Sequence, residues 1–219
     1  MKMPLKVEIN NVRYSILRKI FYDNGVIIFP TDTVYGIGGD PFNINVVNRI
    51  KFLKRRSVNP FPILIDSIDR MRPFIRYSRV IEDLAELIWP GPYTIISKAQ
   101  YKIPAIFNSE FIGFRIPDEE NLLKIIKSIN GYMIGTSANI SGRRPATSID
   151  EAREYFSNKV DMYINGGVRK NPPSTLIVVD DDLNEIFIDR LYDRYEIIHI
   201  VRKICNKYGY SIKILSDLT

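Results

Sequence analysis

The sequence predicts an α/β fold built on a mixed sheet. Short apolar runs typical of strands recur along the chain, and segments with apolar residues at helical spacing lie between several of them. Because the two patterns interleave without strict alternation, a mixed sheet is favoured over a purely parallel, doubly wound one. The 219 residues, of which 45% are hydrophobic, are enough for one compact domain with a substantial core.

The first expected elements are a helix and a buried strand. Apolar residues at helical spacing predict a helix over about residues 11–22, and either Asn10 or Asn11 can cap its N-terminus. The apolar run 26–29 is stopped by Pro30 and is typical of a buried strand.

A polar loop and a second helix follow. The segment TDTVYGIGGD at 31–40 is expected to be a loop, because it carries five glycine or aspartate positions typical of turns. An apolar stripe from Val46 to Leu53 predicts a helix, and the basic cluster from Lys51 to Arg56 closes it.

The remaining elements are predicted from the same two patterns. Three helices are expected: one over about 80–88, one that starts at Glu119 with Asp118 as its cap, and one that begins at the capping box of Ser148 and Glu151. Further strands are expected at 62–66, 93–97, 111–116, 132–136 and 175–179, with another before Arg190.

The last residues read as one helix and a short strand. The chain is therefore divided into a main domain at 1–195 and a C-terminal extension at 196–219 that packs on the same domain.

Charge and cysteine content indicate the partners and the compartment. The net charge of +6 favours anionic partners, and it does not separate nucleotides from RNA. The single Cys205 excludes an intramolecular disulfide framework, which favours a reducing compartment. No apolar run approaches the ~20 residues that span a bilayer, so a cytoplasmic protein without a membrane partner is expected.

Several chemistries are excluded by composition. His199 is the only histidine, so histidine triads and Cys/His metal sites are excluded, a structural role is favoured for it, and no metal site is expected. Neither a GxxxxGK[ST] nor a GxGxxG loop occurs. A nucleotide would therefore be held by scattered cations, backbone N–H groups and hydroxyls, usually together with Mg²⁺.

A cluster of polar side chains follows the first buried strand. Thr31, Asp32, Thr33 and Tyr35 place two hydroxyls, a carboxylate and a phenol where loops often build binding sites. The alternative is a turn in which Thr and Asp bond locally to the backbone. From the residues alone both interpretations stay open.

Two pairs further along are candidate anion ligands. Lys54 and Arg56 end the second helix, and the non-helical exit at 59–62 (NPFP) would aim both cations at a fixed place. The alternative is a pair of solvated cations at a helix end. Ser137 and Asn139 lie in the small-residue loop GTSANISG, which is suited to bringing donors close to an anion.

Two arginines after strands could add further contacts. Arg115 in FRIPD and Arg190 in IFIDR are each able to bind an anion in a bidentate manner. Surface ion pairs are the alternative for both.

Six segments together resemble the YrdC-like threonylcarbamoyl-AMP synthase family in its single-domain form. The resemblance covers about residues 10–191, and the segments are, in order, PTDTVYGIGGDPF, KRRSVNPFPILI, WPGPYTIISKA, GFRIPDEE, GTSANISGRRPATS and NPPSTLIVVD. The family is marked by a Lys-x-Arg and a distant Ser-x-Asn, which here are Lys54 with Arg56 and Ser137 with Asn139.

The resemblance implies a twisted mixed sheet with flanking helices around a concave basic pocket. The implied reaction joins L-threonine, bicarbonate and ATP, with Mg²⁺, into threonylcarbamoyl-AMP and pyrophosphate. A downstream threonylcarbamoyl transferase complex would use this product to modify tRNA, and direct contact with tRNA is compatible with the family.

The resemblance also implies roles for individual residues. The nucleotide would contact Lys54, Arg56, Ser137, Asn139 and Arg190, of which Lys54 and Arg56 are the expected catalytic residues. The amino acid would lie beside Thr31, Thr33, Tyr35, Arg115, Ser174 and Thr175.

The chain departs from the family pattern after the Lys-x-Arg and in the C-terminal domain that longer relatives append, and two rival functions stand beside the synthase. Many relatives carry another basic residue shortly after the Lys-x-Arg, where this chain has Asn59 and Pro60. One rival is an RNA-binding module of the same fold without synthase activity. The other is a hydrogenase-maturation carbamoyltransferase, which is disfavoured because its zinc-finger and acylphosphatase-like regions do not occur in this sequence.

Variants at the marker motifs would separate function from folding. Neither Arg56 nor Asn139 reads as a core residue, so replacing either by Ala is expected to remove turnover and leave the protein folded.

Overall fold

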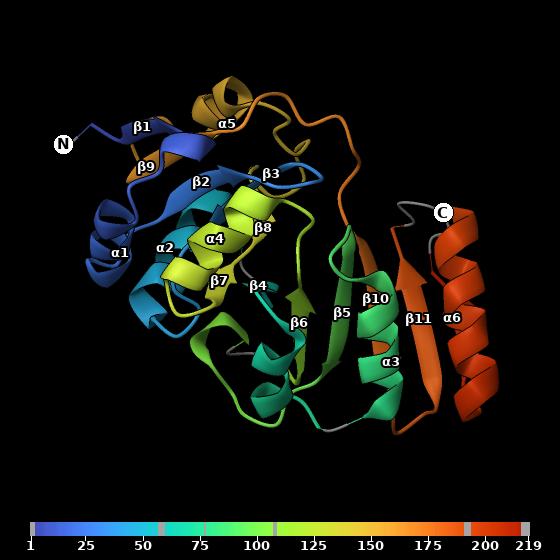
Figure 1. Cartoon of the computed structure of the whole chain (residues 1–219). Helices are drawn as coiled ribbons and strands as arrows, with labels where there is room; N and C mark the ends of the chain where they lie inside the picture. Colours follow the sequence, from blue (N-terminus) through green and yellow to red (C-terminus); the bar gives the residue numbers. More distant parts are fainter. Residues whose placement is uncertain (1–2, 57–59, 77, 107–108, 191–193, 216–219) are drawn as a thin grey trace.

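The computed structural model describes residues 3–56, 60–76, 78–106, 109–190 and 194–215, whose strands form two sheets side by side (Figure 1). The five-stranded sheet has the order β1 (Leu5–Glu8), β9 (Met162–Asn165), β2 (Ile27–Pro30), β3 (Tyr35–Gly38) and β8 (Thr136–Ser137). The seven-stranded sheet has the order β12 (Ser211–Ile214), β11 (Glu185–Asp189), β10 (Thr175–Asp180), β5 (Tyr93–Lys98), β6 (Phe111–Arg115), β4 (Ile63–Ile65) and β7 (Tyr132–Ile134).

Both sheets mix parallel and antiparallel pairs, as the sequence predicts. The expected single sheet is divided in two, and the C-terminal strand β12 extends the larger one by parallel pairing with β11.

Helices pack against both sheets (Figure 1). Leu17 of α1 (Tyr14–Tyr22) and Leu122 of α4 (Glu120–Ser128) join a buried cluster with Ile27, Phe29 and Ile164 of the smaller sheet. Beside the larger sheet, α3 (Arg79–Ile88) packs against α6 (Arg194–Tyr208). The other described helices are α2 (Ile44–Lys54), α5 (Ile149–Phe156) and the short 3₁₀ turns η1 (Ile9–Asn11), η2 (Ile68–Arg70), η3 (Arg72–Phe74) and η4 (Pro104–Ile106).

One predicted loop is wrong. Residues 35–38 of the segment 31–40 form β3, which pairs antiparallel with β2 from Tyr35 opposite Pro30 to Gly38 opposite Ile27. Glycines disfavour strands in isolation, and here the neighbouring strands on both sides override that preference.

The strand predicted at 132–136 is split between the sheets. β7 belongs to the larger sheet and β8 to the smaller one, and Gly135 lies between them. A Cβ atom on Gly135 would lie 2.3 Å from the Leu64 side chain, so only glycine fits at this crossing. The crossing brings Thr136 and Ser137 to the space between the sheets.

Two of the predicted helix caps are wrong and one is confirmed. Asn10 and Asn11 lie in η1, and α1 has Arg13 as its N-cap without a side-chain bond. Glu119, rather than Asp118, precedes α4, again without a side-chain cap. Ser148 does cap α5, because its hydroxyl accepts a hydrogen bond from Glu151 N at 3.2 Å.

Replacing Ser148 with Ala is expected to lower the free energy of unfolding by about 1 kcal/mol, because the N–H of Glu151 loses its partner. Urea denaturation of the two proteins measures the difference. Ser148→Asp should keep most of the stability, since a carboxylate also caps a helix N-terminus. Equal losses in both variants would contradict a capping role.

The C-terminal residues form the expected helix and short strand. α6 begins at Arg194, and Ile197, Val201 and Ile204 on one face of it are buried. The boundary at 195/196 stays a prediction. No helix of the described residues has the length and apolar character that crossing a membrane requires.

Candidate functional site

A cavity of about 370 Å³ lies between the two sheets. Its lining comes from the ends of strands in both sheets and from the loops that follow them. From the smaller sheet come Thr31, Thr33, Val34, Tyr35, Gly36, Thr136, Ser137 and Asn139; from the larger sheet and its connections come Leu64, Ile96, Gly113, Arg115, Ser174, Leu176 and Arg190, with Arg56 from the end of α2. The topology therefore brings together segments that are far apart in the sequence.

The charged side chains of this cavity are all cationic. Arg56, Arg115 and Arg190 line it, and no Asp or Glu in the described part of the chain does so. The pKa of Arg56 is lowered by burial and by the positive charge of Arg190. Two guanidinium groups that repel each other in a partly buried cavity are stabilised by an anion placed between them.

The end of α2 sets the position of Arg56. Arg55 adopts the left-handed conformation with φ 50°, and the N–H of Arg56 donates to Lys51 O at 3.0 Å, which ends the helix. The Arg56 guanidinium carbon lies 5.3 Å from the centroid of the Phe61 ring. The non-helical exit at 59–62 is predicted to orient Lys54 and Arg56. Its Asn59 lies outside the described residues, whereas Pro60 and Pro62 line the cavity.

Arg190 reaches the cavity through a left-handed turn. It follows β11 with φ 55°, and its N–H donates to Asp189 Oδ1 at 2.8 Å. Its Nε lies 3.7 Å from Asp189 Oδ2, a distance too long for a strong ion pair on an exposed side chain. The expected surface ion pair is thus present and weak, and the side chain still lines the cavity.

Lys54 lies behind the cavity wall rather than in it. The residue is 2% exposed, and its ammonium group donates to Ser137 O, to Asn139 O at 3.0 Å and to Asn139 Oδ1 at 3.2 Å. Burial and the neighbouring Arg56 lower the pKa of Lys54 to about 7. Lys54 does line a smaller hollow of about 360 Å³ that opens beside Arg55, Arg56, Ser137, Asn139, Ser141 and Gly142.

Asn139 is a buried residue with several partners, so the expectation that it is not part of the core is wrong. It is 7% exposed, and its Oδ1 accepts from Ser137 Oγ at 2.7 Å as well as from Lys54. Its Nδ2 donates to Ile140 O and Arg143 O at 3.1 and 2.5 Å. Replacing Asn139 would therefore disturb the loop as well as any ligand contact.

The turn after β2 agrees with both interpretations of its sequence, a locally bonded turn and part of a binding site. Thr33 N donates to Thr31 Oγ1 at 3.0 Å, and Thr31 Oγ1 donates to Val34 O at 2.7 Å, so the hydroxyls do bond locally. Both threonines also line the cavity. The turn is a rigid part of the cavity wall.

Arg115 forms a buried ion pair with this turn. Its NH2 lies 2.5 Å from Asp32 Oδ1, and the two side chains are 6% and 12% exposed. Its NH1 donates to Thr33 Oγ1 at 3.2 Å and its Nε to Gly91 O at 3.0 Å. The alternative of a surface ion pair is therefore wrong for Arg115, which these bonds hold in a fixed orientation.

Two of the other predicted residues line the cavity and one does not. Tyr35 lines it, while its hydroxyl donates to Gly167 O at 2.8 Å. Ser174 lines it with its hydroxyl 3.1 Å from Thr94 Oγ1. Thr175 is fully buried and does not line it, because side chains alternate along a strand and Ser174 and Leu176 take the cavity side.

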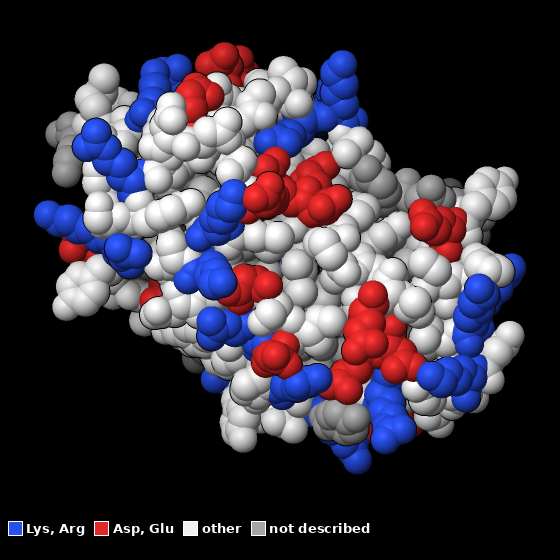
Figure 2. Space-filling view, in the orientation of Figure 1, with Lys and Arg blue, Asp and Glu red and all other residues white. Residues whose placement is uncertain are grey.

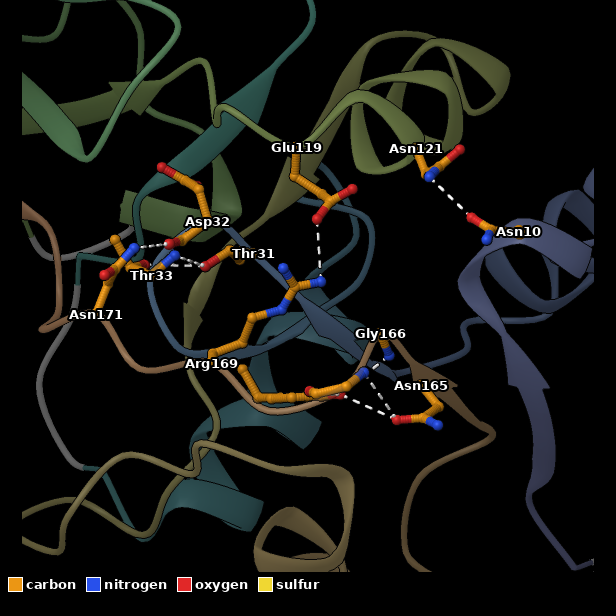
Figure 3. Close-up of polar contacts among 12 residues, drawn as sticks. Asn10, Thr31, Asp32, Thr33, Glu119, Asn121, Asn165, Gly166, Arg169 and Asn171 are labelled. Atoms are coloured by element: carbon orange, nitrogen blue, oxygen red, sulfur yellow. Dashed lines mark hydrogen bonds and ion pairs between the residues drawn. The ribbon is translucent and has the colours of Figure 1, made fainter.

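The connecting segment 166–174 runs from β9 to β10 (Figure 1), and its Pro173 and Ser174 line the cavity. Figure 3 shows how two of its side chains hold it: Arg169 points toward Glu119, with NH2 3.0 Å from Oε2, and Asn171 Nδ2 donates to Asp32 O at 2.8 Å. Arg169 N also donates to Thr147 O at 2.7 Å. The sequence patterns did not single out Arg169 or Asn171, because both are ordinary polar residues of a loop.

The described residues contain no group of three or more His, Cys, Asp or Glu that could hold a metal ion. His199 is exposed on α6 and is not among the residues that line the cavity.

A family model and several known proteins are similar to this chain. Residues 19–187 match the Sua5, YciO and YrdC family model, whose description is "Telomere recombination". A Methanocaldococcus jannaschii protein named "Putative threonylcarbamoyl-AMP synthase" is 34% identical over 171 residues, which are 77% of this chain and 81% of that protein.

Solved structures have a similar fold. P. abyssi Sua5, crystallised in complex with L-threonine, superposes with a TM-score of 0.82 and 26% identity over 97% of this chain and 63% of that one. The chain thus spans less than two thirds of the P. abyssi Sua5 chain. E. coli YciO superposes with a TM-score of 0.72 at 23% identity over 84% of this chain and 93% of that one, a likeness of fold alone.

Proposed function

The chain belongs to the Sua5, YciO and YrdC family, and from that membership we propose that it is an L-threonylcarbamoyladenylate synthase. The family resemblance predicted from six sequence segments is thereby confirmed. The observation that carries the proposal is the cavity between the sheets, where three arginines and several hydroxyls converge without a carboxylate among the described lining residues.

The arginines at one end of the cavity suit the triphosphate of ATP. Arg56 and Arg190 lie close enough for the charge of one to lower the pKa of the other. Guanidinium groups bind phosphate oxygens through paired hydrogen bonds, and Ser137 adds a hydroxyl at the same wall. We assign the nucleotide phosphates to this end.

The turn after β2 suits the amino acid. Thr31 and Thr33 lie beside Arg115, and only three of the five N–H groups of that guanidinium are used by Gly91, Thr33 and Asp32. A carboxylate could accept from the other two. Tyr35 and Ser174 would complete the walls of this end.

The chemistry that we propose needs no protein nucleophile. The threonine amine attacks bicarbonate, and loss of water leaves a carbamate. A carbamate oxygen then attacks the α-phosphate of ATP, and the bond to pyrophosphate breaks. Orienting three anionic reactants and neutralising their charge is the main task, which arginines and hydroxyls can perform without histidine or cysteine.

Magnesium would enter with the nucleotide. Mg²⁺ is commonly held by substrate phosphates and water, with one or two carboxylates at most. The described lining supplies hydroxyls and no carboxylate, so the residues present fit a metal carried by ATP rather than one held by the protein.

Pyrophosphate release tests the proposed reaction. The purified protein with ATP, Mg²⁺ and bicarbonate is expected to release pyrophosphate only when L-threonine is added. L-serine and L-valine, tried in place of threonine, test whether the amino-acid hydroxyl and methyl groups are both required. ATP cleavage without an amino acid, or no release of pyrophosphate under any condition, would refute the proposed synthase activity.

If the protein were instead an RNA-binding module, we would expect it to have an open basic surface. Figure 2 shows acidic side chains gathered near the centre of the visible face, with Lys and Arg scattered among and around them. On this face the positive charge is not continuous, whereas the charge that lines the cavity is of one sign. The synthase is therefore the function that we favour.

A further inference from the structure

Three segments supply the residues that we assign to the amino acid, and they are tied to one another in pairs. The turn after β2 carries Thr33, and the end of β6 carries Arg115. The connecting segment 166–174 ends on Ser174. Arg115 joins the first two segments through its ion pair with Asp32. The connecting segment makes the other two ties.

The first of these ties is an ion pair between Arg169 and Glu119. NH2 of Arg169 lies 3.0 Å from Oε2 of Glu119, just before α4, and the two side chains are 18% and 16% exposed (Figure 3). The backbone of Arg169 is held as well, because its N–H donates to Thr147 O at 2.7 Å. A largely buried ion pair thus links the connecting segment to the chain that leaves β6.

The guanidinium of Arg169 folds back over its own segment. A Cβ atom on Gly166 would lie 2.5 Å from both Arg169 NH2 and Pro30 Cγ, so a side chain there would displace the guanidinium and strike Pro30. Tyr35, which lines the cavity, fixes the same stretch. Its hydroxyl accepts from Gly166 N at 3.0 Å and donates to Gly167 O at 2.8 Å. The connecting segment therefore leaves β9 in a fixed direction.

The second tie joins the connecting segment to the turn after β2. Nδ2 of Asn171 donates to Asp32 O at 2.8 Å (Figure 3). Two prolines separate Asn171 from Ser174, and the chain between them has little freedom, because proline fixes its own φ and restricts the residue before it. Pro173 and Ser174 line the cavity. The position of Asn171 is thus passed on to the cavity wall.

We propose that Arg169 and Asn171 are positioning residues for the amino-acid substrate. Neither is among the described residues that line the cavity, and each ties together two segments that do supply its lining. The inference rests on the proposed function. The ties should act on the amino-acid end alone, because none of their hydrogen bonds and ion pairs involves Arg56 or Arg190, to which we assign the phosphates.

The alternative is that the two ties only stabilise the fold. Arg169 Nε is buried and has no hydrogen-bond partner among the described residues. A buried N–H without a partner offsets part of what the ion pair contributes to stability. This arrangement favours a role in placing the segment over a role in stability alone.

A double-mutant cycle in steady-state kinetics tests the tie between Arg169 and Glu119. Arg169→Ala and Glu119→Ala are each expected to raise KM for L-threonine about 10- to 30-fold, while kcat and KM for ATP stay within about twofold of the parent. The double variant leaves neither charge unpaired, so it should resemble the single variants instead of multiplying their effects. An equal rise in KM for ATP, or multiplied effects, would overturn the proposal.

Asn171→Ala tests the second tie. One hydrogen bond to the turn is lost, so KM for L-threonine should rise about 3- to 10-fold, again without a change in KM for ATP. Arg153→Ala is the matched control, because Arg153 forms an exposed ion pair with Asp150 within α5 and does not line the cavity. This control should match the parent in every kinetic constant.

Hydrogen exchange separates a loss of position from a loss of fold and does not depend on activity. In the double variant, peptides that cover 166–174 and 31–35 should exchange about tenfold faster, while β5 and β10 keep their protection. Unaltered exchange in these two peptides, or equal acceleration throughout both sheets, would overturn the proposal. A parent protein without threonine-dependent pyrophosphate release would refute the proposed function, whereas an active double variant with an unchanged KM for threonine would refute this inference alone.

Discussion

Replacing Arg56 with Ala is expected to reduce threonine-dependent pyrophosphate release by roughly 10²- to 10³-fold, the cost typical of one lost donor to developing charge. Arg56 lines the cavity beside Arg190, and the pair would face the phosphates, where charge changes most during the reaction. Initial rates over a range of ATP concentrations measure the effect.

The fold of this variant should be retained. Burial and Arg190 both lower the pKa of Arg56, which means that its charge is disfavoured in the folded protein before an anion binds. Removing it relieves the repulsion from Arg190, at the loss of contacts that include the one with the Phe61 ring. The melting temperature should stay close to that of the parent.

Two further variants define what Arg56 does. Arg56→Lys should recover part of the activity, because a lysine keeps the charge but not the paired geometry of a guanidinium. Lys51→Ala on the same helix is the control and should be fully active. An inactive, unfolded Arg56→Ala protein would instead support a structural role at the helix end.

Much of the fold could be predicted from local patterns. The strands β4, β5, β6 and β10 and the helix α2 are apolar runs or stripes whose period is visible in the sequence, and the structure has them within a residue or two of the expected bounds. β1 and β9 were not predicted. They pair with each other in parallel at the edge of the smaller sheet, across more than 150 residues, and such pairing leaves no local signal.

The residue types of the candidate site could be predicted from the sequence, whereas the directions of their side chains could be predicted only in part. Arg56, Arg115, Ser137 and Arg190 lie at or just after the ends of strands or a helix and do meet at one cavity. Which side chains face it depends on sheet pairing, so the side of Thr175 was predicted wrongly. The inward direction of Lys54 could not be read from the sequence either, because its acceptors lie 83 and 85 residues away.

The second large effect is expected at the buried ion pair of Arg115 and Asp32. Replacing Arg115 with Met leaves the Asp32 carboxylate, 12% exposed, without its cation. Breaking a buried pair by removing one partner costs about 3–5 kcal/mol, a large part of the ~5–15 kcal/mol that stabilises a typical domain. Urea denaturation should show this loss. The exposed pair of Lys124 and Glu120 provides the control, since Lys124→Met should cost less than about 1 kcal/mol.

A paired variant separates the structural part of this effect from recognition. Arg115→Met combined with Asp32→Leu removes both charges, so much of the lost stability should return. If Arg115 also binds the amino-acid carboxylate, the restored protein will still fail to release pyrophosphate with threonine, while its affinity for ATP stays near that of the parent. Recovery of threonine-dependent activity together with stability would show that the arginine serves only to hold the turn after β2.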